Sequence, residues 1–391
     1  MRDVYVVGIG ITSFTRLEYP LSEIAAYPAM MALRDAGLRA VDHLYVANMG
    51  GGRVNHQTGL ASAVVDTLSL TPAGAETVEN GPASGASAIK EGFLAVASGM
   101  HDVVLVTGAE RMREVNNLEA TDFVATLTHP LAEYIYGVTL PSLAGMFTRL
   151  YMEKYGVTER HLAMVAVKNQ NNALLNEFAH LHQPITVEGI LDSPEAMTNN
   201  PYVAEPLRFF DCCPVSDGGA CVILASREAA EGLGKPFVRL AGIGQATDTH
   251  CVHEREEPTD LLAVRSAASQ AFDRAELAPS DVDVAELHDA FTILEIVESE
   301  EVGFFEKGQG HLAVERGETS LGGRLPINPS GGLKGRGHPV GATGVAQAYE
   351  VVLQLRGEAG ERQVEGARVG FTCNFGGFGN NVVCLVFARE G

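Results

Sequence analysis

The sequence contains no tryptophan and is short of positive charge. Its 28 lysines and arginines are outnumbered by 49 aspartates and glutamates, which gives a formal net charge of −21 at pH 7. A chain this acidic repels the phosphates of nucleic acids and of anionic lipid headgroups, so we expect neither as its main partner. An anionic ligand would need a pocket that is locally basic.

Long apolar runs are also missing. The chain begins MRDVYVVGIGITSF, whose apolar part is too short for a signal peptide, and no run approaches the roughly eighteen residues of a transmembrane helix. The six cysteines show no C-x-x-C spacing, and the adjacent Cys212 and Cys213 suit neither a disulfide framework nor a zinc site. The sequence therefore predicts a cytoplasmic protein with no membrane span.

Metal-binding spacing is absent as well. Histidines occur in small local sets, but no set has a carboxylate at the spacing that zinc sites use. We therefore expect no metal site in this chain. The sets are His129, His180 with His182, and His250 with His253.

What the chain does contain is an internal repeat. With 391 residues it is long enough for two or more cores. Residues 4–12 (VYVVGIGIT) and 238–247 (VRLAGIGQAT) are both aliphatic runs that lead into G-I-G and then polar residues. Each precedes an alanine-rich amphipathic segment, LSEIAAYPAMMALRDAGL or LLAVRSAASQAFDRAEL, which predicts a helix.

The later elements repeat in the same order: ASGASAIKEGFLAVASG precedes the strand DVVLVTGAE, and GATGVAQAYEVVLQLRG precedes ARVGFTCNF. Two β-α-β-α-β copies, split by an insertion from about residue 111 to about 233, predict an α/β fold with mainly parallel sheets covered on both faces. We expect one half from 1–115 with 205–233, an inserted loop domain over 116–204, and a second half over 234–391.

The helices expected to begin near Ser84 and Gly341 are small or apolar almost all round. Such helices are usually buried between layers. Small residues at their starts let another group approach closely, and helix N-termini favour anions or developing oxyanions. Close packing alone explains the same residues equally well.

The stretch VENGPASGASAIKEG, residues 78–92, has the pattern of a strand that turns sharply into a helix. Such a corner often presents a nucleophile. Here the corner is Pro82, which has neither a nucleophilic group nor a backbone N–H.

Three stretches of the C-terminal half could carry chemistry. ELHDAF places His288 just past a strand, and NPSGGLKGRGHPVGATG places His338 at a glycine-rich turn before the second buried helix. TCNFGGFGNN places Asn374 and Gly376 at a turn between two apolar strands. A single histidine is more often structural than catalytic, but strand ends and helix starts are where α/β folds place their sites.

With these motifs the sequence resembles the thiolase superfamily, in the branch of archaeal and sterol-carrier-associated thiolases. The resemblance covers nearly the whole chain and includes VENGPASGASA, DCCPVSDGGACVIL, ELHDAF, GHPVGATG and NFGGFGNN. It implies a five-layer α-β-α-β-α core, with the insertion forming a loop domain over the active site. It also implies a homodimer or a dimer of dimers that acts on acyl-CoA thioesters, with coenzyme A as part of the substrate and no covalently bound cofactor.

The resemblance assigns roles residue by residue. His338 matches the histidine that holds the thioester oxygen as an enolate forms, and His288 contributes to the same oxyanion hole. Asn374 falls where many thiolases keep a second, acid/base cysteine. Gly376 matches the glycine whose N–H lines a second oxyanion hole. Pro82 falls on the nucleophilic cysteine.

The proline at position 82 changes the expected chemistry. A covalent acyl-enzyme needs a nucleophile, which Pro82 cannot supply. The N–H that would pair with that of Gly376 is also missing, and losing one oxyanion donor typically lowers the rate by about 10²–10³. Cys373 should point away from Asn374 by strand alternation, and Ser84 is more simply a helix-start residue.

Contacts to coenzyme A follow partly from charge and partly from the resemblance. Basic residues near the motifs are candidate phosphate contacts, although an ordinary surface role fits each of them equally well: Arg208, Lys334 and Arg336. By resemblance, Ser330 and Gly331 line the route of the pantetheine arm.

Three functions remain open at this point. The first is aldol-type (retro-aldol) cleavage of a β-hydroxyacyl-CoA, which needs no acyl-enzyme. The second is β-ketoacyl-CoA thiolysis or acyl transfer, by direct attack of CoA or with a small zinc-ribbon/OB-fold partner subunit. The third is a non-catalytic subunit that binds CoA esters, against which the two retained histidines argue.

Overall fold

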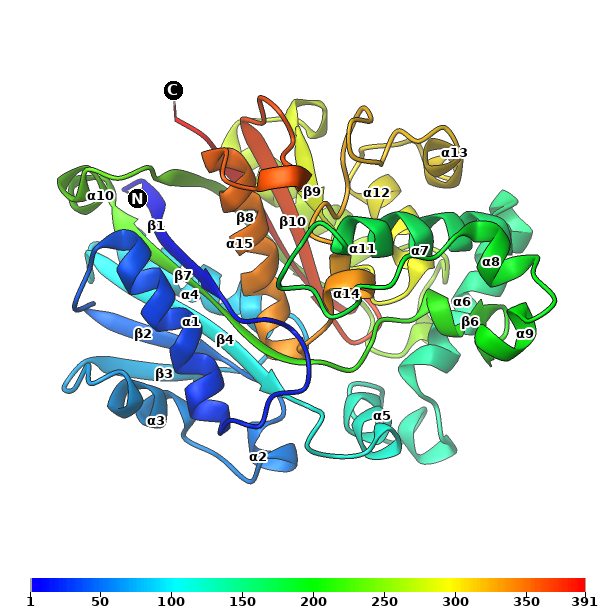
Figure 1. The fold of residues 1–391 in the computed structure, drawn as a ribbon, viewed down its shortest axis with the longest axis horizontal. Coiled ribbons are helices and arrows are strands. Elements are labelled where there is room, and N and C mark those ends of the chain that lie inside the picture. The colour runs from blue at the N-terminus through cyan, green and yellow to red at the C-terminus, as the bar shows by residue number, and fades with distance from the viewer. Residues whose placement is uncertain (1, 391) are drawn as a thin grey trace.

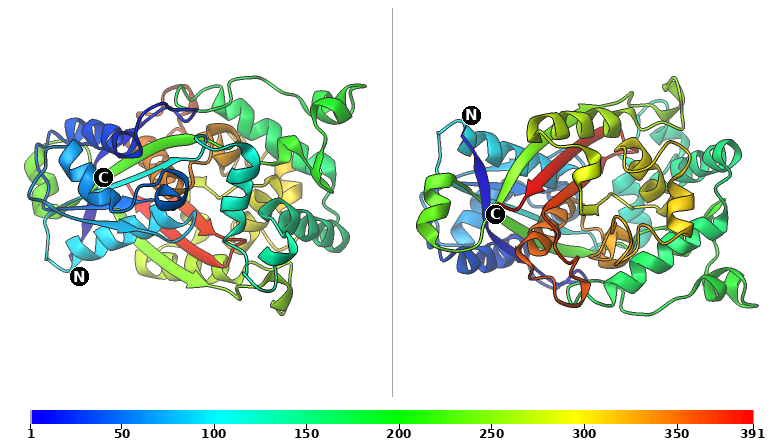
Figure 2. Two further views of the ribbon diagram at one scale, coloured as in Figure 1. Left: turned by 90° about the horizontal axis from the view of Figure 1, so that it is seen from below. Right: turned by 90° about the horizontal axis from the view of Figure 1, so that it is seen from above.

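The computed structural model describes residues 2–390 and shows a mixed α/β architecture (Figure 1). Nine strands are hydrogen-bonded in the order β3-β2-β4-β7-β1-β8-β11-β10-β9. The N-terminal half, the C-terminal half and the insertion occupy different parts of the molecule (Figure 2). No helix among the described residues combines the length and apolarity needed to cross a membrane.

The N-terminal half supplies five of the strands and their covering helices. They follow the sequence pattern closely, because the three strands and two helices of the predicted β-α-β-α-β copy are all present. The elements are β1 (Val4–Ile11), α1 (Leu21–Ala36), β2 (His43–Ala47), α2 (Gly51–Val54), α3 (Leu60–Thr67), β3 (Gly74–Val78), α4 (Ser84–Ala97), β4 (Val103–Arg111), β7 (Asp217–Ser226) and α10 (Arg227–Leu233).

The C-terminal half repeats this plan, as the sequence predicted. Its strand order β9-β10-β11-β8 reproduces β2-β4-β7-β1. The elements are β8 (Val238–Thr247), α11 (Leu262–Ala275), β9 (Val284–Glu286), α12 (Thr292–Glu301), α13 (Gly310–Glu315), α14 (Gly332–Arg336), α15 (Thr343–Arg356), β10 (Val369–Gly376) and β11 (Asn381–Ala388).

The halves are stacked into five layers. Helix α1 packs on one face of the N-terminal strands, and α4 and α15 lie side by side on the other face. Helix α15 also contacts β10, so the α4–α15 pair forms the middle layer, and α11 covers β8 and β11 on the far side. The predicted α-β-α-β-α core is confirmed.

The expectation of mainly parallel strands is wrong. Only β2 with β3, β2 with β4, and β9 with β10 are parallel. In each half one strand is antiparallel to both of its neighbours from that half. In the N-terminal half β7, which follows the long insertion, pairs with β4 and β1, and in the C-terminal half β11, which follows a short turn, pairs with β10 and β8. The short segment between β10 and β11 makes a hairpin, which only antiparallel strands allow.

The insertion between β4 and β7 folds mostly as helices at one end of the molecule, coloured cyan to green in Figure 1. Threonine and asparagine side chains cap several of these helices, which explains where they begin. The elements are α5 (Asn117–Ala125), α6 (Leu140–Tyr155), α7 (Glu159–Ala173), α8 (Val187–Leu191), α9 (Ala196–Asn199), β5 (Tyr202–Ala204) and β6 (Leu207–Arg208).

The repeated G-I-G motif has a packing reason. Gly8 and Gly10 of β1 face the backbone of α1, and Gly242 and Gly244 of β8 face the backbone of α11. In each case a side-chain carbon would meet a helix carbonyl or Cβ atom at less than normal contact distance. Glycine therefore lets the outer helix lie directly on the strand.

The middle helices approach each other equally closely. A Cβ atom on Gly85 of α4 would lie 2.8 Å from the backbone nitrogen of Gly344 in α15. Both helices are buried along almost their whole length, as their composition predicted. The small residues at their starts are thus explained by helix packing, which sets the two preceding turns side by side.

Replacing Gly85 with alanine should destabilise the protein by about 1–3 kcal/mol, because overpacking forces backbone shifts. A Cβ atom on Gly232 of α10 would have no other atom within 4 Å, so Gly232→Ala is a matched control expected to be neutral or slightly stabilising. Thermal and chaotrope unfolding of both variants would measure the difference. Equal midpoints for the two variants would contradict the close contact.

Candidate active site

The two turns that precede the middle helices open into one pocket. Its volume is about 160 Å³, and it lies between the core and the insertion. Pro82, His288 and His338, which are far apart in sequence, all line it. The other lining residues are Met112, Ala120, Thr121, Val124, Leu127, Leu140, Pro141, Cys212, Cys213, Pro214, Val215, Ala290, Phe291, Leu294, Val340, Phe375, Gly377 and Phe378.

The Pro82 turn is closed by its own hydrogen bonds. The hydroxyl of Ser84 accepts from the N–H of Asn80 at 2.7 Å and donates to the carbonyl of Gly81 at 2.6 Å. Gly81 has a φ of 56°, a left-handed conformation that glycine adopts without strain. Ser84 is therefore a turn and helix-start residue, and Pro82 stands at the corner facing the pocket.

His288 follows β9 and is fixed through its backbone. Its N–H donates to Glu298 Oε2 at 2.9 Å. Burial, followed by the nearby Cys373, raises the pKa of Glu298 well above its usual range. The carboxyl group is thus a local hydrogen-bond partner that holds the end of β9 against α12.

Asp289 ties the His288 motif to the glycine-rich motif. Its carboxylate accepts from the backbone N–H groups of Leu333 at 2.6 Å and Lys334 at 3.2 Å, at the start of α14. Asn169 of α7 donates to the same carboxylate at 2.7 Å. One buried acid therefore joins the insertion, β9 and the turn before His338.

Glu110 performs the same task on the other side. At the end of β4 it accepts from the N–H groups of Met49 and Gly341 at 3.0 Å each and of Gly50 at 2.8 Å. Burial raises the pKa of Glu110 to about 7. Gly341 lies three residues beyond His338, so Glu110 anchors the histidine's turn to the N-terminal half.

The two imidazoles meet edge to face, with ring centroids 5.0 Å apart. His338 Nδ1 lies 2.7 Å from Thr343 Oγ1, and that hydroxyl donates its single proton to the Pro339 carbonyl at 3.0 Å. Nδ1 of His338 must then be the donor. We assign the tautomer on this basis, which leaves Nε2 of His338 as a hydrogen-bond acceptor.

Asn374 fixes the opposite tautomer in His288. Its amide nitrogen donates to the carbonyl of Pro82 at 3.1 Å and lies 3.2 Å from Nδ1 of His288. Its amide oxygen accepts from the N–H of Ala86 at 3.3 Å. Nδ1 of His288 therefore accepts, and Nε2 of His288 carries the proton.

Both imidazoles are neutral near pH 7. Burial, with a smaller effect of Arg336, lowers the pKa of His338 to about 3. Burial also lowers the pKa of His288 well below its usual value, with further contributions from His338 and Arg336. The pocket thus holds one imidazole acceptor and one imidazole donor without a net charge.

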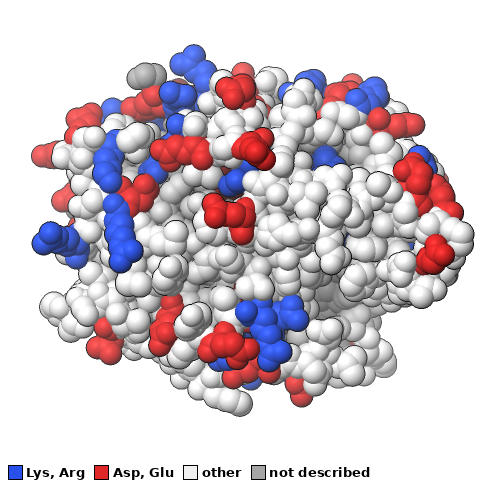
Figure 3. Space-filling view, viewed as in Figure 1, with Lys and Arg blue, Asp and Glu red and all other residues white. Residues whose placement is uncertain are grey.

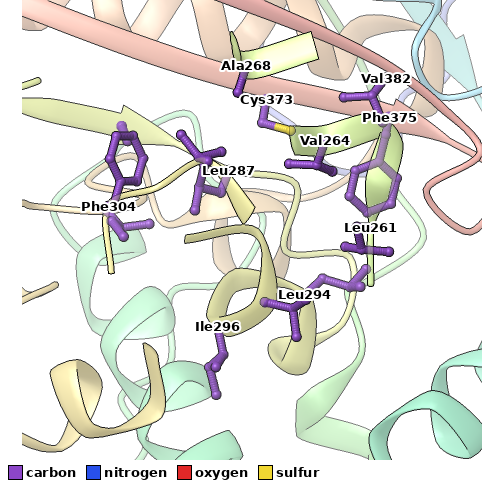
Figure 4. Close-up of a cluster of buried hydrophobic side chains, with 14 of the residues drawn as sticks. Leu261, Val264, Ala268, Leu287, Leu294, Ile296, Phe304, Cys373, Phe375 and Val382 are labelled. Carbon is purple, nitrogen blue, oxygen red and sulfur yellow. The ribbon is translucent and has the colours of Figure 1, made fainter. Parts of the chain in front are cut away.

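The cysteines near the pocket are poor nucleophiles. Cys212 and Cys213 line it, but burial raises the pKa of Cys213 to about 12 and that of Cys212 also well above its usual value. Cys373, beside Asn374, points into the hydrophobic cluster with Val264, Ala268 and Leu287, as strand alternation predicted (Figure 4). All six cysteines are free thiols.

Three residues predicted to contact coenzyme A do not line this pocket. Arg336 is only 1% exposed and pairs with Glu286 at 3.1 Å, so it cannot meet a phosphate at the surface. The hydroxyl of Ser330 donates to the same carboxylate at 2.7 Å. Gly331 packs directly on Ala173 of α7. These residues build the buried support beneath α14.

The remaining predicted contacts lie elsewhere. Arg208 donates to Glu159 at 2.8 Å and stacks over Tyr202, and it keeps part of its surface exposed. Lys334 lines a neighbouring cleft rather than the Pro82 pocket. Gly376 abuts Pro82, since a Cβ there would lie 3.4 Å from Pro82 Cδ, and it faces another cleft. Its role as an oxyanion donor stays a prediction.

In the folded chain a carboxylate lies next to one of the histidine sets, although none is near it in the sequence at the spacing of a zinc site. Ligand atoms of Glu133, Cys251 and His253 all lie within 4.8 Å of one another. Both carboxylate oxygens of Glu133 already accept backbone N–H bonds, from His129 at 2.8 Å and Val252 at 3.2 Å. These bonds hold together the two loops on which the cluster lies.

Several functional partners escaped the sequence reasoning. Thr343, Glu298, Asp289 and Glu110 set the orientation of the histidines, yet only Asp289 adjoins a predicted site residue in the sequence. Each is a polar residue that the fold buries, and a polar residue in the sequence does not show which group it will bond to.

Charged side chains of both signs lie on the surface of the molecule. On the face shown in Figure 3, acidic and basic side chains are interspersed around a broad uncharged area.

The five-layer core thus carries a buried imidazole pair in a pocket that residues of the insertion help to line. The chain belongs to the thiolase family: residues 4–228 match the thiolase N-terminal domain, and residues 244–389 match the thiolase C-terminal domain-like family.

Two kinds of relative span the chain. An acetyl-CoA acetyltransferase of Methanothermobacter thermautotrophicus is 43% identical and covers 100% of both chains. Human sterol carrier protein 2 is 32% identical over 98% of this chain and 72% of its own length.

Solved structures agree with the fold. An Ltp2-ChsH2(DUF35) aldolase superposes with a TM-score of 0.83 at 26% identity, covering 99% of this chain and 98% of that chain. An acetyl-CoA acetyltransferase from Syntrophomonas wolfei superposes with a TM-score of 0.74 at 19% identity over 100% of both chains, and it supports the fold alone. The protein is an enzyme of acyl-CoA chemistry, an acyltransferase or a lyase.

The depressed pKa of His338 makes stability depend on pH. In the unfolded chain this residue binds a proton below pH 6.5. In the folded chain it stays unprotonated until the pH falls to about 3. His338→Gln removes this penalty, so wild type should lose about 2 kcal/mol relative to the variant between pH 7 and pH 5. Denaturant unfolding at several pH values would measure it. A constant difference would contradict the neutral, buried imidazole.

Proposed function

We propose that this enzyme cleaves a β-hydroxyacyl-CoA by a retro-aldol reaction, without an acyl-enzyme. The observation that carries the proposal is the pair of oppositely oriented imidazoles in one pocket with Pro82. The two rings lie with their centroids 5.0 Å apart, and one presents an acceptor nitrogen while the other presents a donor N–H. This arrangement suits a reaction that removes one proton and stabilises one oxyanion. A nucleophile at position 82 is not needed for this chemistry.

The reaction follows from the tautomers. Nε2 of His338 takes the proton of the β-hydroxyl group. The Cα–Cβ bond breaks, its electron pair moves into the thioester as an enolate, and the β-carbon leaves as a carbonyl product. Nε2–H of His288 donates to the enolate oxygen, and the proton held by His338 then returns to Cα to give the shorter acyl-CoA.

Pro82 takes the nucleophile's place in this proposal. Its ring fills the corner at the start of α4, and its carbonyl accepts from Asn374, the residue that orients His288. The corner is thus used to position the donor imidazole instead of carrying an acyl group. The 26%-identical neighbour supports the assignment, since that protein is named as an aldolase.

Acyl transfer is the second candidate. The relative from Methanothermobacter thermautotrophicus, at 43% identity, is named as an acetyl-CoA acetyltransferase. For this chain, such a reaction would require CoA to attack a β-ketoacyl-CoA directly, with the same imidazoles as base and oxyanion donor. A subunit that only binds CoA esters would not need two imidazoles with matched hydrogen-bonding partners.

The assembly is also part of the proposal. Strand β3 lies at an edge of the sheet and leaves its outer backbone groups unpaired among the described strands, which suits pairing with a second copy in a homodimer. The aldolase neighbour carries two component names, one of them marked DUF35. This supports a second subunit, which the resemblance to thiolases predicts to be a small one of the zinc-ribbon/OB-fold kind; any zinc would then belong to that subunit.

Incubation with a β-hydroxyacyl-CoA should yield a shorter acyl-CoA and a carbonyl compound, both detected by mass spectrometry. His338→Gln should lower the rate by about 10²–10⁴, because the base is lost. His101→Gln, a half-exposed histidine outside the pocket, should leave it unchanged. Turnover of a β-ketoacyl-CoA with CoA, and none of the β-hydroxy compound, would decide for acyl transfer. Unaltered turnover in His338→Gln would exclude the catalytic role.

Pro82→Cys tests the position itself. A thiol there would lie in the same pocket as the acceptor nitrogen of His338, and the substitution also restores a backbone N–H. Incubation with acetyl-CoA should then give an acetyl adduct at residue 82, while the wild type gives none. Peptide mass spectrometry makes the measurement. An adduct on a wild-type cysteine or serine would overturn the proposal, and no adduct in the variant would show that position 82 is not the nucleophile site.

A further inference from the structure

A second cleft lies behind the Cys212–Cys213 segment. Its volume is about 660 Å³, within the range of small-molecule sites. Cys212, Cys213 and Pro214 line both this cleft and the Pro82 pocket, so the two share a wall. We call it the Lys334 cleft; its other lining residues are Gln170, His180, Leu181, His182, Gln183, Phe209, Phe210 and Lys334.

Lys334 brings an unpaired charge to this cleft. Its side chain is only 2% exposed, and within residues 2–390 its ammonium group makes no ion pair and donates no hydrogen bond. It lies 5.5 Å from the centre of the Phe210 ring. Burial lowers the pKa of Lys334, and the nearby acidic groups only partly oppose this effect.

The acids that act on Lys334 are engaged elsewhere. Asp211 accepts from Thr292 at 2.9 Å and from the N–H of Arg208 at 2.8 Å. Asp289 accepts from backbone N–H groups at the start of α14 and from Asn169. A buried ammonium group without a close counterion is costly, which points to a partner that the chain itself does not provide.

The same cleft has an unused acceptor. The amide nitrogen of Gln170 donates to the carbonyl of Gln183 at 2.7 Å, but the amide oxygen of Gln170 is buried with no partner. A buried acceptor of this kind is itself unfavourable. A ligand that carries both an anionic oxygen and an N–H or O–H donor would satisfy Lys334 and Gln170 together.

We propose that the Lys334 cleft binds a small ligand through a carboxylate or phosphate group on Lys334 and an N–H or O–H group on Gln170. Phe209 and Phe210 provide apolar faces beside the charged group. The anionic group comes either from coenzyme A or from an independent small acid. Because the cleft shares its wall with the Pro82 pocket, an occupant would contact the Cys212–Pro214 segment that also lines the reaction site.

Competitive acetylation of wild-type protein tests the proposal without any turnover. Lys334 and the exposed Lys235 are labelled with trace acetic anhydride in benzoate, inorganic phosphate or S-methyl coenzyme A, whose blocked thiol does not consume the anhydride, against sodium chloride of equal ionic strength. We expect at least one anion to slow labelling of Lys334 several-fold and to leave Lys235 unchanged. Protection by S-methyl coenzyme A alone identifies the phosphates of coenzyme A, and protection by benzoate or phosphate identifies an independent acid. Equal labelling in all solutions overturns the proposal.

Variants separate binding from a structural role. The protecting anion should raise the unfolding midpoint of wild type and of the control Lys235→Met, because a ligand stabilises the state it binds. It should not raise that of Lys334→Met. If Lys334→Met is merely less stable and still gains the same midpoint shift, the ammonium group is structural and the proposal fails. Since neither measurement uses a substrate, both outcomes are independent of the retro-aldol assignment.

Discussion

Everything at the reaction site depends on the close contact between α4 and α15 in the middle layer. Gly85 and Gly344 let the two helix backbones touch. Because the Pro82 turn leads into α4 and the His338 turn leads into α15, this contact places the two turns over the same pocket. A wider separation of the helices would break the hydrogen bond from Asn374 to Pro82. It would also move the Pro82 turn away from the two imidazoles.

Around this contact the protein uses buried acids as connectors. Glu110 joins the His338 turn to the N-terminal half, Asp289 joins the His288 motif to α14 and the insertion, and Glu298 holds the backbone of His288. Each acid accepts from backbone N–H groups, so it orients a turn without presenting its charge to the pocket. The reaction site can therefore be apolar and uncharged while the scaffold beneath it is rich in carboxylates.

The two histidines have the same side chain but different hydrogen-bonding partners, and these partners give them opposite tautomers. Thr343 gives its proton to a carbonyl and so makes His338 donate through Nδ1, whereas Asn374 donates to Nδ1 of His288. Low solvent access keeps both rings neutral. One imidazole acceptor and one imidazole donor are then present in one resting state, as the proposed retro-aldol reaction requires.

The sequence by itself determined the internal repeat with its strands and helices, because hydrophobic periodicity is a local property. His288 and His338 became candidates through their positions at a strand end and a glycine-rich turn, and the five-layer core followed from the resemblance to thiolases. The sequence predicted mainly parallel strands wrongly, since β7 returns to pair antiparallel with β4 across the long insertion and β11 folds back on β10 in a hairpin. Only the tertiary structure decided that Arg336 is buried against Glu286 while Lys334, two residues away, reaches a cleft. On the short α14 that difference depends on which neighbour covers each side chain, and no spacing within the chain encodes it.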